Sequence, residues 1–297
     1  MKSIRVALSV AGGVASLLLA RSLLEPYGLS EEHHDAAIPN LPASWEGQKI
    51  VLLCDLHVGM RGGPPSTVRR AVKRAIHARP AAVLIAGDFI HDRAQAIDDA
   101  VELLGPLLNS GIPVYAVLGN HDYAMPTKDA TADWKLARCL EGSLEAAGVR
   151  VLHNEAVELR AVEGEQPLYL VGIGAHTARD DQVAEALSGV PSGAARVVMM
   201  HHPASFDQCP AGSAPFAVAG HTHGGQVRLP LAPILNYLTY SKELKVIVSG
   251  WIHADGIQGY GKTGNHLYVS RGIGCSVLPM RLFCPPEFTV FTLRSAA

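Results

Sequence analysis

Apolar and polar positions alternate in blocks along most of the chain, and these blocks predict strands that alternate with helices. Short apolar runs, such as residues 50–54 and 82–86, have the length of buried strands. Between these two runs, Val68, Ala71 and Val72 begin a series of apolar residues at helical spacing that continues one turn further. This alternation predicts an α/β layer fold.

The same pattern predicts the remaining elements. Helices are expected after Pro64-Pro65, around 97–104, over 133–147 and over 180–187. Strands are expected over 50–54, 82–86, 113–118, 149–152, 157–159, 168–173, 195–200, 216–219, 246–248, 266–270 and 288–293. Residues 25–45, which contain three prolines and the acidic pair Glu31-Glu32, are expected to form an extended lead-in to the folded domain.

The first 24 residues form a separate unit in the hydropathy pattern. Lys2 and Arg5 precede an apolar run of fifteen residues, 6–20, which Arg21 interrupts. The run has the length of a signal-peptide core, is shorter than the roughly 20 residues of a membrane span, and is not followed by a good A-x-A cleavage site. We expect a signal-anchor or membrane-associated helix over 1–24 and a single domain over 25–297. The alternative is an amphipathic helix lying on that domain, and whether the segment is cleaved stays open.

Charge favours one orientation of such an anchor. Lys2 and Arg5 precede the apolar run, whereas Arg21 is the only nearby positive residue after it and acidic residues follow. The positive-inside rule then keeps the N-terminus in the cytoplasm and, in a bacterium, places residues 25–297 at the periplasmic face of the inner membrane. A cytoplasmic face is the alternative.

Composition excludes several classes of protein. The 297 residues are 48% hydrophobic and 18% charged, which excludes a disordered chain. A net charge of −2 gives no basis for binding a nucleic acid duplex. The five cysteines include no C-x-x-C pair, and their odd number argues against a complete disulfide framework. The fourteen histidines are more informative, because several lie in Asp/His clusters that suit metal binding and proton transfer.

Five predicted strands run directly into polar clusters. These are Asp55-Leu56-His57, Gly87-Asp88, Gly119-Asn120-His121-Asp122, His201-His202-Pro203 and Gly220-His221-Thr222-His223. Ligands of parallel α/β sheets gather at the carboxyl ends of strands. The pairs Asp55/His57 and His221/His223 are spaced i, i+2, so an extended backbone would direct both members of each pair to one side.

In order and spacing, the five clusters resemble those of the calcineurin-like metallophosphoesterases over roughly residues 25–293. The segments 267–274 and Cys284-Pro285-Pro286-Glu287 resemble the membrane-anchored bacterial branch that includes the YkuE and YaeI proteins. One departure is Cys54, where the family usually carries Ser. The resemblance implies a four-layer α/β sandwich of two mixed β-sheets flanked by helices.

The resemblance also implies a dinuclear metal centre. One ion would be held by Asp55, His57, Asp88 and His223, and the other by Asp88, Asn120, His201 and His221, with Asp88 bridging. Mixed imidazole and carboxylate donors favour Mn, Fe or Zn, whereas Ca and Mg prefer oxygen ligands. Two such divalent transition-metal ions would turn a bridging water into hydroxide for in-line attack on phosphorus.

Other residues near these clusters are expected to have supporting roles. His121 is expected to act as general acid, with Asp122 as its orienting partner. His202 is interpreted as structural, with the alternative that it is the true ligand at this position. Arg61 either contacts a phosphate or is solvated. Eight further histidines are interpreted as surface or packing residues: His33, His34, His77, His91, His153, His176, His253 and His266.

The expected activity is metal-dependent hydrolysis of a phosphodiester or pyrophosphate rather than a monoester, on a small-molecule or lipid-linked substrate. The alternatives are a lipid-precursor pyrophosphatase of the UDP-diacylglucosamine type and a catalytically silent interaction module on the same fold. A third alternative, a P-loop nucleotide switch, rests on residues 256–263, which fit G-x-x-x-x-G-K-[ST]. A P-loop must open a helix, and a strand is expected at 266–270 instead. The substrate, the native metal and the oligomeric state stay open.

Overall fold

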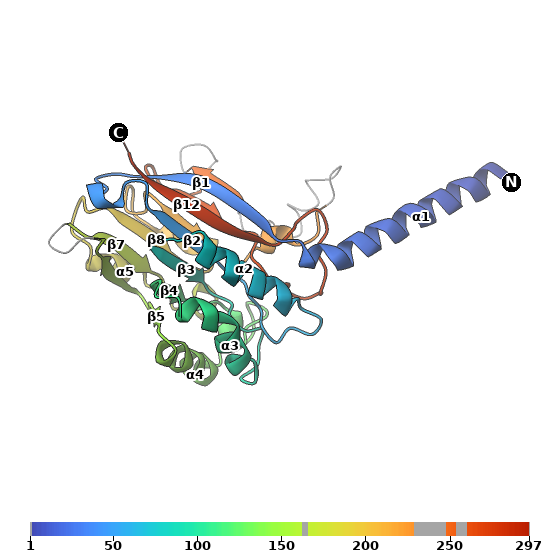
Figure 1. Cartoon of the computed structure of the whole chain (residues 1–297), viewed down its shortest axis with the longest axis horizontal. Helices are drawn as coiled ribbons and strands as arrows, with labels where there is room; N and C mark the ends of the chain where they lie inside the picture. Colours follow the sequence, from blue (N-terminus) through green and yellow to red (C-terminus); the bar gives the residue numbers. More distant parts are fainter. Residues whose placement is uncertain (1, 162–165, 229–247, 254–259, 297) are drawn as a thin grey trace.

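Two mixed β-sheets pack face to face in the computed structural model, which describes residues 2–161, 166–228, 248–253 and 260–296 (Figure 1). The first sheet has the order β1 (Ser30–Ile38), β12 (Glu287–Ser295), β2 (Lys49–Leu53), β3 (Ala82–Ala86), β4 (Val114–Val117) and β5 (Val149–Val151). The second has the order β10 (Gly250–His253), β11 (His266–Val269), β9 (Ala217–Ala219), β8 (Arg196–Met199), β7 (Leu168–Gly172) and β6 (Glu155–Leu159). The pairs β12·β2, β10·β11 and β6·β7 are antiparallel and the others are parallel. The predicted pair of mixed sheets is confirmed.

Helices cover the outer faces of both sheets. On the first sheet these are α2 (Pro65–His77), α3 (Ala96–Leu108) and α4 (Trp134–Ala146), and α5 (Val183–Ser188) contacts β6 and β7 of the second. Strand β2 is buried on both sides: Val51 and Leu53 pack under the helices, while Ile50 and Leu52 pack between the sheets. Burial on both faces explains why the strands read as continuous apolar runs rather than alternating ones.

Helix starts follow local capping chemistry. Asp133 accepts hydrogen bonds from the backbone N–H groups of Lys135 and Leu136, so α4 begins where a cap is available. Helix α5 begins at Val183, three residues later than expected, without a side-chain cap at Gln182, and the Asp181 carboxylate just before it lies 2.6 Å from Nδ1 of His176.

The expected lead-in at 25–45 contains a strand of the first sheet. Strand β1 runs parallel to β12 at the sheet edge, and only its last residues, such as Ala36 and Ile38, are fully buried. Glu31, Glu32 and Asp35 lie on this edge strand, and their charge hid the strand from a search for apolar runs. Strand β10 was also not predicted. The strand expected at 246–248 falls almost entirely outside the described residues.

Helix α1 (Lys2–Leu24) projects away from the sandwich (Figure 1). Its base is attached to the domain, because the backbone N–H of Arg281 donates to the carbonyl oxygen of Ser22. The Arg21 guanidinium also lies 4.4 Å from the centre of the Phe283 ring. Further out, large apolar side chains such as Val14 and Leu17 are exposed. Across the part of the chain that the structure describes, no helix is both long and apolar enough to cross a membrane.

Candidate metal centre

The carboxyl ends of five strands bring all seven predicted metal ligands together. The ligands follow β2, β3 and β4 of the first sheet and β8 and β9 of the second, each within four residues of the strand end. They are Asp55, His57, Asp88, Asn120, His201, His221 and His223. Six of these side chains are almost completely buried, and His221 is partly exposed.

Asp88 lies between histidines of the two sheets. Its Oδ2 is 3.3 Å from Nε2 of His57 and 3.3 Å from Nε2 of His201. Nε2 of His57 is also 2.9 Å from Nε2 of His223, which in turn lies 3.5 Å from Oδ1 of Asp55. Asp55, His57, Asp88 and His223 therefore form one group whose donor atoms all lie within 4.8 Å of one another.

A second group shares Asp88 with the first. It consists of Asp88, His201 and His221, and its donor atoms meet the same limit. Asn120 adds an oxygen to this group, because its Oδ1 is 3.1 Å from Nε2 of His201 and 2.8 Å from Nδ1 of His221. The two groups match the two ligand sets that the family resemblance implies.

The i, i+2 argument assumed an extended backbone at these side chains, but the backbone there is not extended. Asp55, His57, Asp88, His221 and His223 all have positive φ, between 46° and 71°. Non-glycine residues rarely adopt this left-handed conformation, and it is concentrated at functional sites where the surrounding fold enforces it. Each pair does point to one site, but tight turns rather than strand alternation bring this about.

Glycines make room for these turns. A Cβ atom at position 119 would lie 2.2 Å from Oδ1 of Asp88, and one at position 220 would lie 2.5 Å from Oδ2 of Asp55. No side chain fits at either position without displacing a carboxylate. Gly119 and Gly220 are therefore needed for the carboxylates to reach the centre.

The charge and donor chemistry of the site fit divalent cations. Burial lowers the pKa of His57 to about 4 and also lowers the pKa values of His221 and His223, so these imidazoles are neutral and their nitrogen lone pairs can bind a metal. Burial opposes ionisation of Asp88 and His201, but their mutual attraction outweighs it, lowering the pKa of Asp88 and raising that of His201 to about 9. Neutral imidazoles beside buried carboxylates are the donor set of Mn, Fe or Zn sites.

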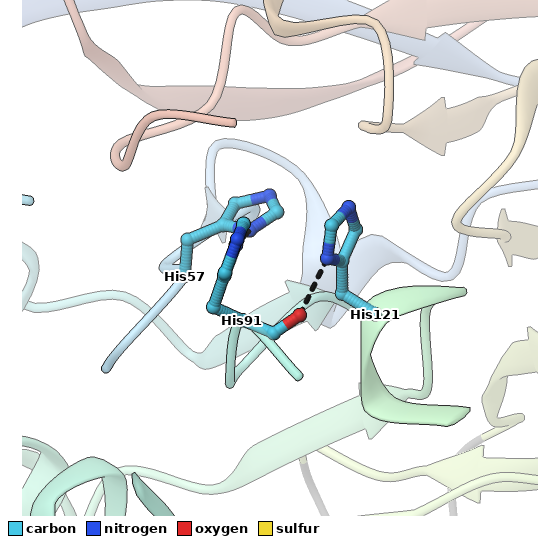
Figure 2. Close-up of side chains that lie close together, drawn as sticks. All are labelled: His57, His91 and His121. Carbon is cyan, nitrogen blue, oxygen red and sulfur yellow. Dashed lines mark hydrogen bonds between the residues drawn. The ribbon is translucent and has the colours of Figure 1, made fainter. Parts of the chain in front are cut away.

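His121 lies next to the centre in an orientation set by the backbone. Its N–H donates to Oδ1 of Asp88 at 2.9 Å, and its ring centre is 4.5 Å from that of His57. Nδ1 of His121 lies 2.5 Å from the carbonyl oxygen of His91 (Figure 2). A carbonyl only accepts, so Nδ1 carries a proton and donates it, which leaves Nε2 for proton transfer.

Asp122 does not orient His121 as expected. Its carboxylate accepts from three backbone N–H groups, those of Asp88 at 2.9 Å, Gly119 at 2.8 Å and Ile90 at 3.1 Å. These contacts tie the loop after β4 to the loop after β3. The expectation of an Asp122–His121 pair is wrong, because the Asp122 carboxylate accepts from these backbone amides instead. The group that accepts from the His121 ring is the carbonyl oxygen of His91.

His91 belongs to the site, although the sequence indicated a surface or packing role. Its Nδ1 lies 3.2 Å from Nδ1 of His57, and its ring stacks on that of His121 with centres 4.9 Å apart (Figure 2). The three histidines form a third group of candidate metal-binding side chains. One signal was available: His91 follows Asp88 by three residues in the same loop.

His202 contacts the site through its ring and takes part in neither ligand group. Its Nδ1 accepts a hydrogen bond of 3.0 Å from the backbone N–H of Ala204, which caps the short helix Pro203–Gln208. Its ring centre lies 4.1 Å from that of His221. The structure therefore places it beside a ligand in a structural contact.

The P-loop alternative finds no support in the described residues. Residues 256–259 of the pattern lie outside them, and Gly261–Asn265 is not helical. Strand β11 begins at His266, directly after Lys262-Thr263-Gly264-Asn265. No helix N-terminus follows Lys262, as the pattern would require.

Comparison with known proteins agrees with the site. Residues 48–254 match the family described as calcineurin-like phosphoesterase. The chain is 30% identical to Phosphodiesterase YaeI of Escherichia coli (strain K12), over 82% of each chain. It is 26% identical to Uncharacterized metallophosphoesterase YkuE of Bacillus subtilis (strain 168), over 92% of this chain and 88% of the relative. It is 23% identical to UDP-2,3-diacylglucosamine pyrophosphatase LpxG of Chlamydia muridarum (strain MoPn / Nigg), over 90% of each.

The family match covers more than half of the chain, and the fold and the clustered ligands agree with it. The chain therefore belongs to the calcineurin-like phosphoesterase family and is a hydrolase that acts on phosphoric esters.

Proposed function

We propose that the protein hydrolyses a phosphodiester or a pyrophosphate at a dinuclear metal centre. The observation that carries this proposal is the position of Asp88, whose Oδ2 lies 3.3 Å from histidines of both sheets. Asp55, His57 and His223 would complete one site with Asp88, and Asn120, His201 and His221 would complete the other. The nitrogen-rich donor set favours Mn, Fe or Zn.

The chain's own residues have distinct tasks in this reaction. Bound divalent ions would supply Lewis acidity and activation of a water for attack on phosphorus. His121 donates a proton from Nε2 to the departing oxygen. The His91 carbonyl accepts a hydrogen bond from the opposite ring nitrogen and so favours the ring orientation that presents Nε2. Asp55 and Asp88 offset only part of the charge of two divalent ions, which leaves a positive pocket for phosphate.

The names of the relatives support the substrate class. YaeI is described as a phosphodiesterase and LpxG as a pyrophosphatase of a lipid-linked nucleotide, and both reactions leave a substituent on the attacked phosphorus. A small-molecule or lipid-linked diester or pyrophosphate is therefore the proposed substrate, with the UDP-diacylglucosamine type as its lipid form.

The test is hydrolysis of two chromogenic esters by the purified chain reconstituted with Mn, Fe or Zn. We expect kcat/KM to be higher for bis(p-nitrophenyl) phosphate than for p-nitrophenyl phosphate. Faster cleavage of the monoester would overturn the diester assignment. Failure to cleave either ester with any of the three metals would instead favour a catalytically silent module. Lys262→Ala serves as the matched control, since it removes a cation outside the centre and should leave both rates unchanged.

We also propose that residues 1–24 attach the domain to a membrane, with the catalytic domain at the periplasmic face in a bacterium. Two observations support attachment: α1 projects from the domain, and its apolar side chains, including Val14 and Leu17, are exposed. A reporter that is active only outside the cytoplasm, fused after Ala297, tests the face. A silent fusion, together with an active cytoplasmic reporter at the same position, would reverse the orientation.

A further inference from the structure

A cavity of about 770 Å³ opens beside the metal centre, between loops of the two sheets. Asn120 and His221 form one wall, so the cavity reaches two of the proposed ligands directly. The lining also includes residues 126–129 of the loop after β4, and His176, Thr177 and Arg179, which belong to the short helix η4 (His176–Ala178) and the residue that ends it. A substrate bound at the centre would extend into this space.

A row of histidine rings holds η4 in place next to the centre. The ring of His221 lies 4.1 Å from that of His202, which lies 4.8 Å from that of His176. Asp181 fixes the end of this row, because its Oδ2 is 2.6 Å from Nδ1 of His176 and also accepts from Ser205 at 2.8 Å. The wall that carries Arg179 is therefore part of the packed domain.

Arg179 is placed as a binding residue would be. It ends η4 in the left-handed conformation, with φ of 57°, which is costly for a residue with a long side chain. Within the described part of the chain its guanidinium makes no ion pair and no hydrogen bond, although it lines a cavity. The two carboxylates on the cavity wall are those of Asp129 and Asp181, and the latter is engaged by His176 and Ser205. A guanidinium can bind two oxygens of a phosphate at once.

We propose that this cavity is a subsite for a second anionic group of the substrate and that Arg179 binds that group. The inference rests on the proposed function and narrows it: the substrate carries a further phosphate or carboxylate near the phosphorus that is attacked, as a pyrophosphate does. A diester with two neutral substituents would leave Arg179 unused.

A second cavity near the metal centre provides a control residue for Arg179. It measures about 430 Å³ and is lined by Arg61, His91 and Arg93 among others, but by none of the proposed ligands. Arg93 is already paired with Asp92 at 3.3 Å. Arg61 is therefore a matched control: an exposed arginine at a cavity near the site, in a position from which the proposal expects no contribution.

Calorimetric titration of the metal-loaded protein with AMP and with the non-hydrolysable α,β-methylene analogue of ADP, called ADP below, tests the subsite by binding alone. These probes differ by one phosphate, and a charge-assisted contact to it corresponds to about tenfold in affinity. We expect ADP to bind at least about tenfold more tightly than AMP to the unaltered protein. Arg179→Ala should reduce this ratio to about twofold, Arg179→Lys should restore part of it, and Arg61→Ala should leave it unchanged.

The outcomes separate this inference from the proposed function. Equal binding of AMP and ADP to the unaltered protein, an unchanged ratio in Arg179→Ala, or loss of the ratio in Arg61→Ala would each overturn the subsite. A metal content and a thermal unfolding midpoint equal to those of the unaltered protein show that Arg179→Ala is folded and that its metal centre is intact. Absence of hydrolysis by the unaltered protein would refute the proposed function instead.

Discussion

The two sheets contribute different chemistry to the centre. The first sheet supplies both carboxylates, the amide and one imidazole, from Asp55, Asp88, Asn120 and His57. The second supplies imidazoles alone, from His201, His221 and His223. The negative charge of the site therefore resides on one half of the sandwich, and neutral or protonated nitrogen faces it from the other.

The loops of the two sheets are also held differently. Loops of the first sheet are tied to one another by the Asp122 carboxylate and by the hydrogen bond from the Asp55 N–H to the Gly87 carbonyl at 3.0 Å. Loops of the second sheet are tied to the first through groups of the site itself, for example the His221 N–H that donates to Oδ1 of Asp55 at 3.0 Å. The loops of the first half thus hold the carboxylates in place, and loops of the second half contact these carboxylates directly.

Asp88→Asn should have the largest effect on metal binding and hydrolysis, because Asp88 contacts histidines of both halves. The change removes the charge that faces His57 and His201, so both ligand groups lose their shared member. We expect loss of most bound metal and a fall in diester hydrolysis of about 10³-fold or more, measured by elemental analysis and kcat/KM. Asp92→Asn, in the same loop but paired with exposed Arg93, is the control. A variant with two ions and full rate would refute the bridging role.

His121→Ala should separate chemistry from metal binding. His121 is placed by the first sheet's loops and belongs to neither of the two proposed ligand sets, so metal content should be retained while turnover falls about 10²-fold or more. Esters with good leaving groups should suffer less than esters with poor ones, since they need less protonation. An equal loss across leaving groups would assign His121 to binding instead. His33→Ala, on the exposed edge strand, is the control.

Asp122→Asn should weaken the hydrogen bonds that connect the loops of the first sheet. An amide offers one accepting oxygen where the carboxylate offers two, and its N–H group would face a backbone donor. We expect the free energy of unfolding to fall by about 2 kcal/mol, measured by denaturant titration. Asp133→Asn is the matched control, because Asn caps a helix about as well as Asp. Unchanged stability in Asp122→Asn would show that the loops do not depend on this carboxylate.

A pH dependence of metal binding should arise from His201 on the second half, and its effect within one pH unit is the smallest of the four. Because His201 has a pKa of about 9, it is protonated near pH 7 and must release its proton to bind a metal. Metal affinity should therefore rise with pH, by up to about tenfold per unit between pH 6 and 8. Metal titrations at three pH values measure this slope. A metal affinity that is constant over this range would contradict the assignment of His201 as a ligand that loses a proton when the metal binds.

The sequence was informative wherever an apolar strand runs into a polar turn. Asp88, Asn120 and His201 each follow such a strand, which predicted their position at strand ends, and the family resemblance predicted that they meet at one centre. The left-handed backbone at Asp55 and His57 could not, because it depends on how the turns are packed and not on residue spacing.

The hydrogen-bond partners of His121 and Asp122 could not be predicted from the sequence either. The His91 carbonyl that holds His121 is a backbone atom, and any residue type supplies one. The side chain of Asp122 was assigned to its sequence neighbour His121, although it accepts from the backbone amides of Asp88, Ile90 and Gly119. The roles of the His91 carbonyl and of the Asp122 side chain both depend on tertiary contacts, which the sequence does not show.

The most direct test of the dinuclear centre is elemental analysis of the purified protein after saturation with Mn and removal of free metal. We predict about two ions per chain, since the two ligand groups share only Asp88. We also predict that the loaded protein hydrolyses bis(p-nitrophenyl) phosphate. A protein that binds no transition metal and shows no hydrolysis after reconstitution would contradict the assignment of this site.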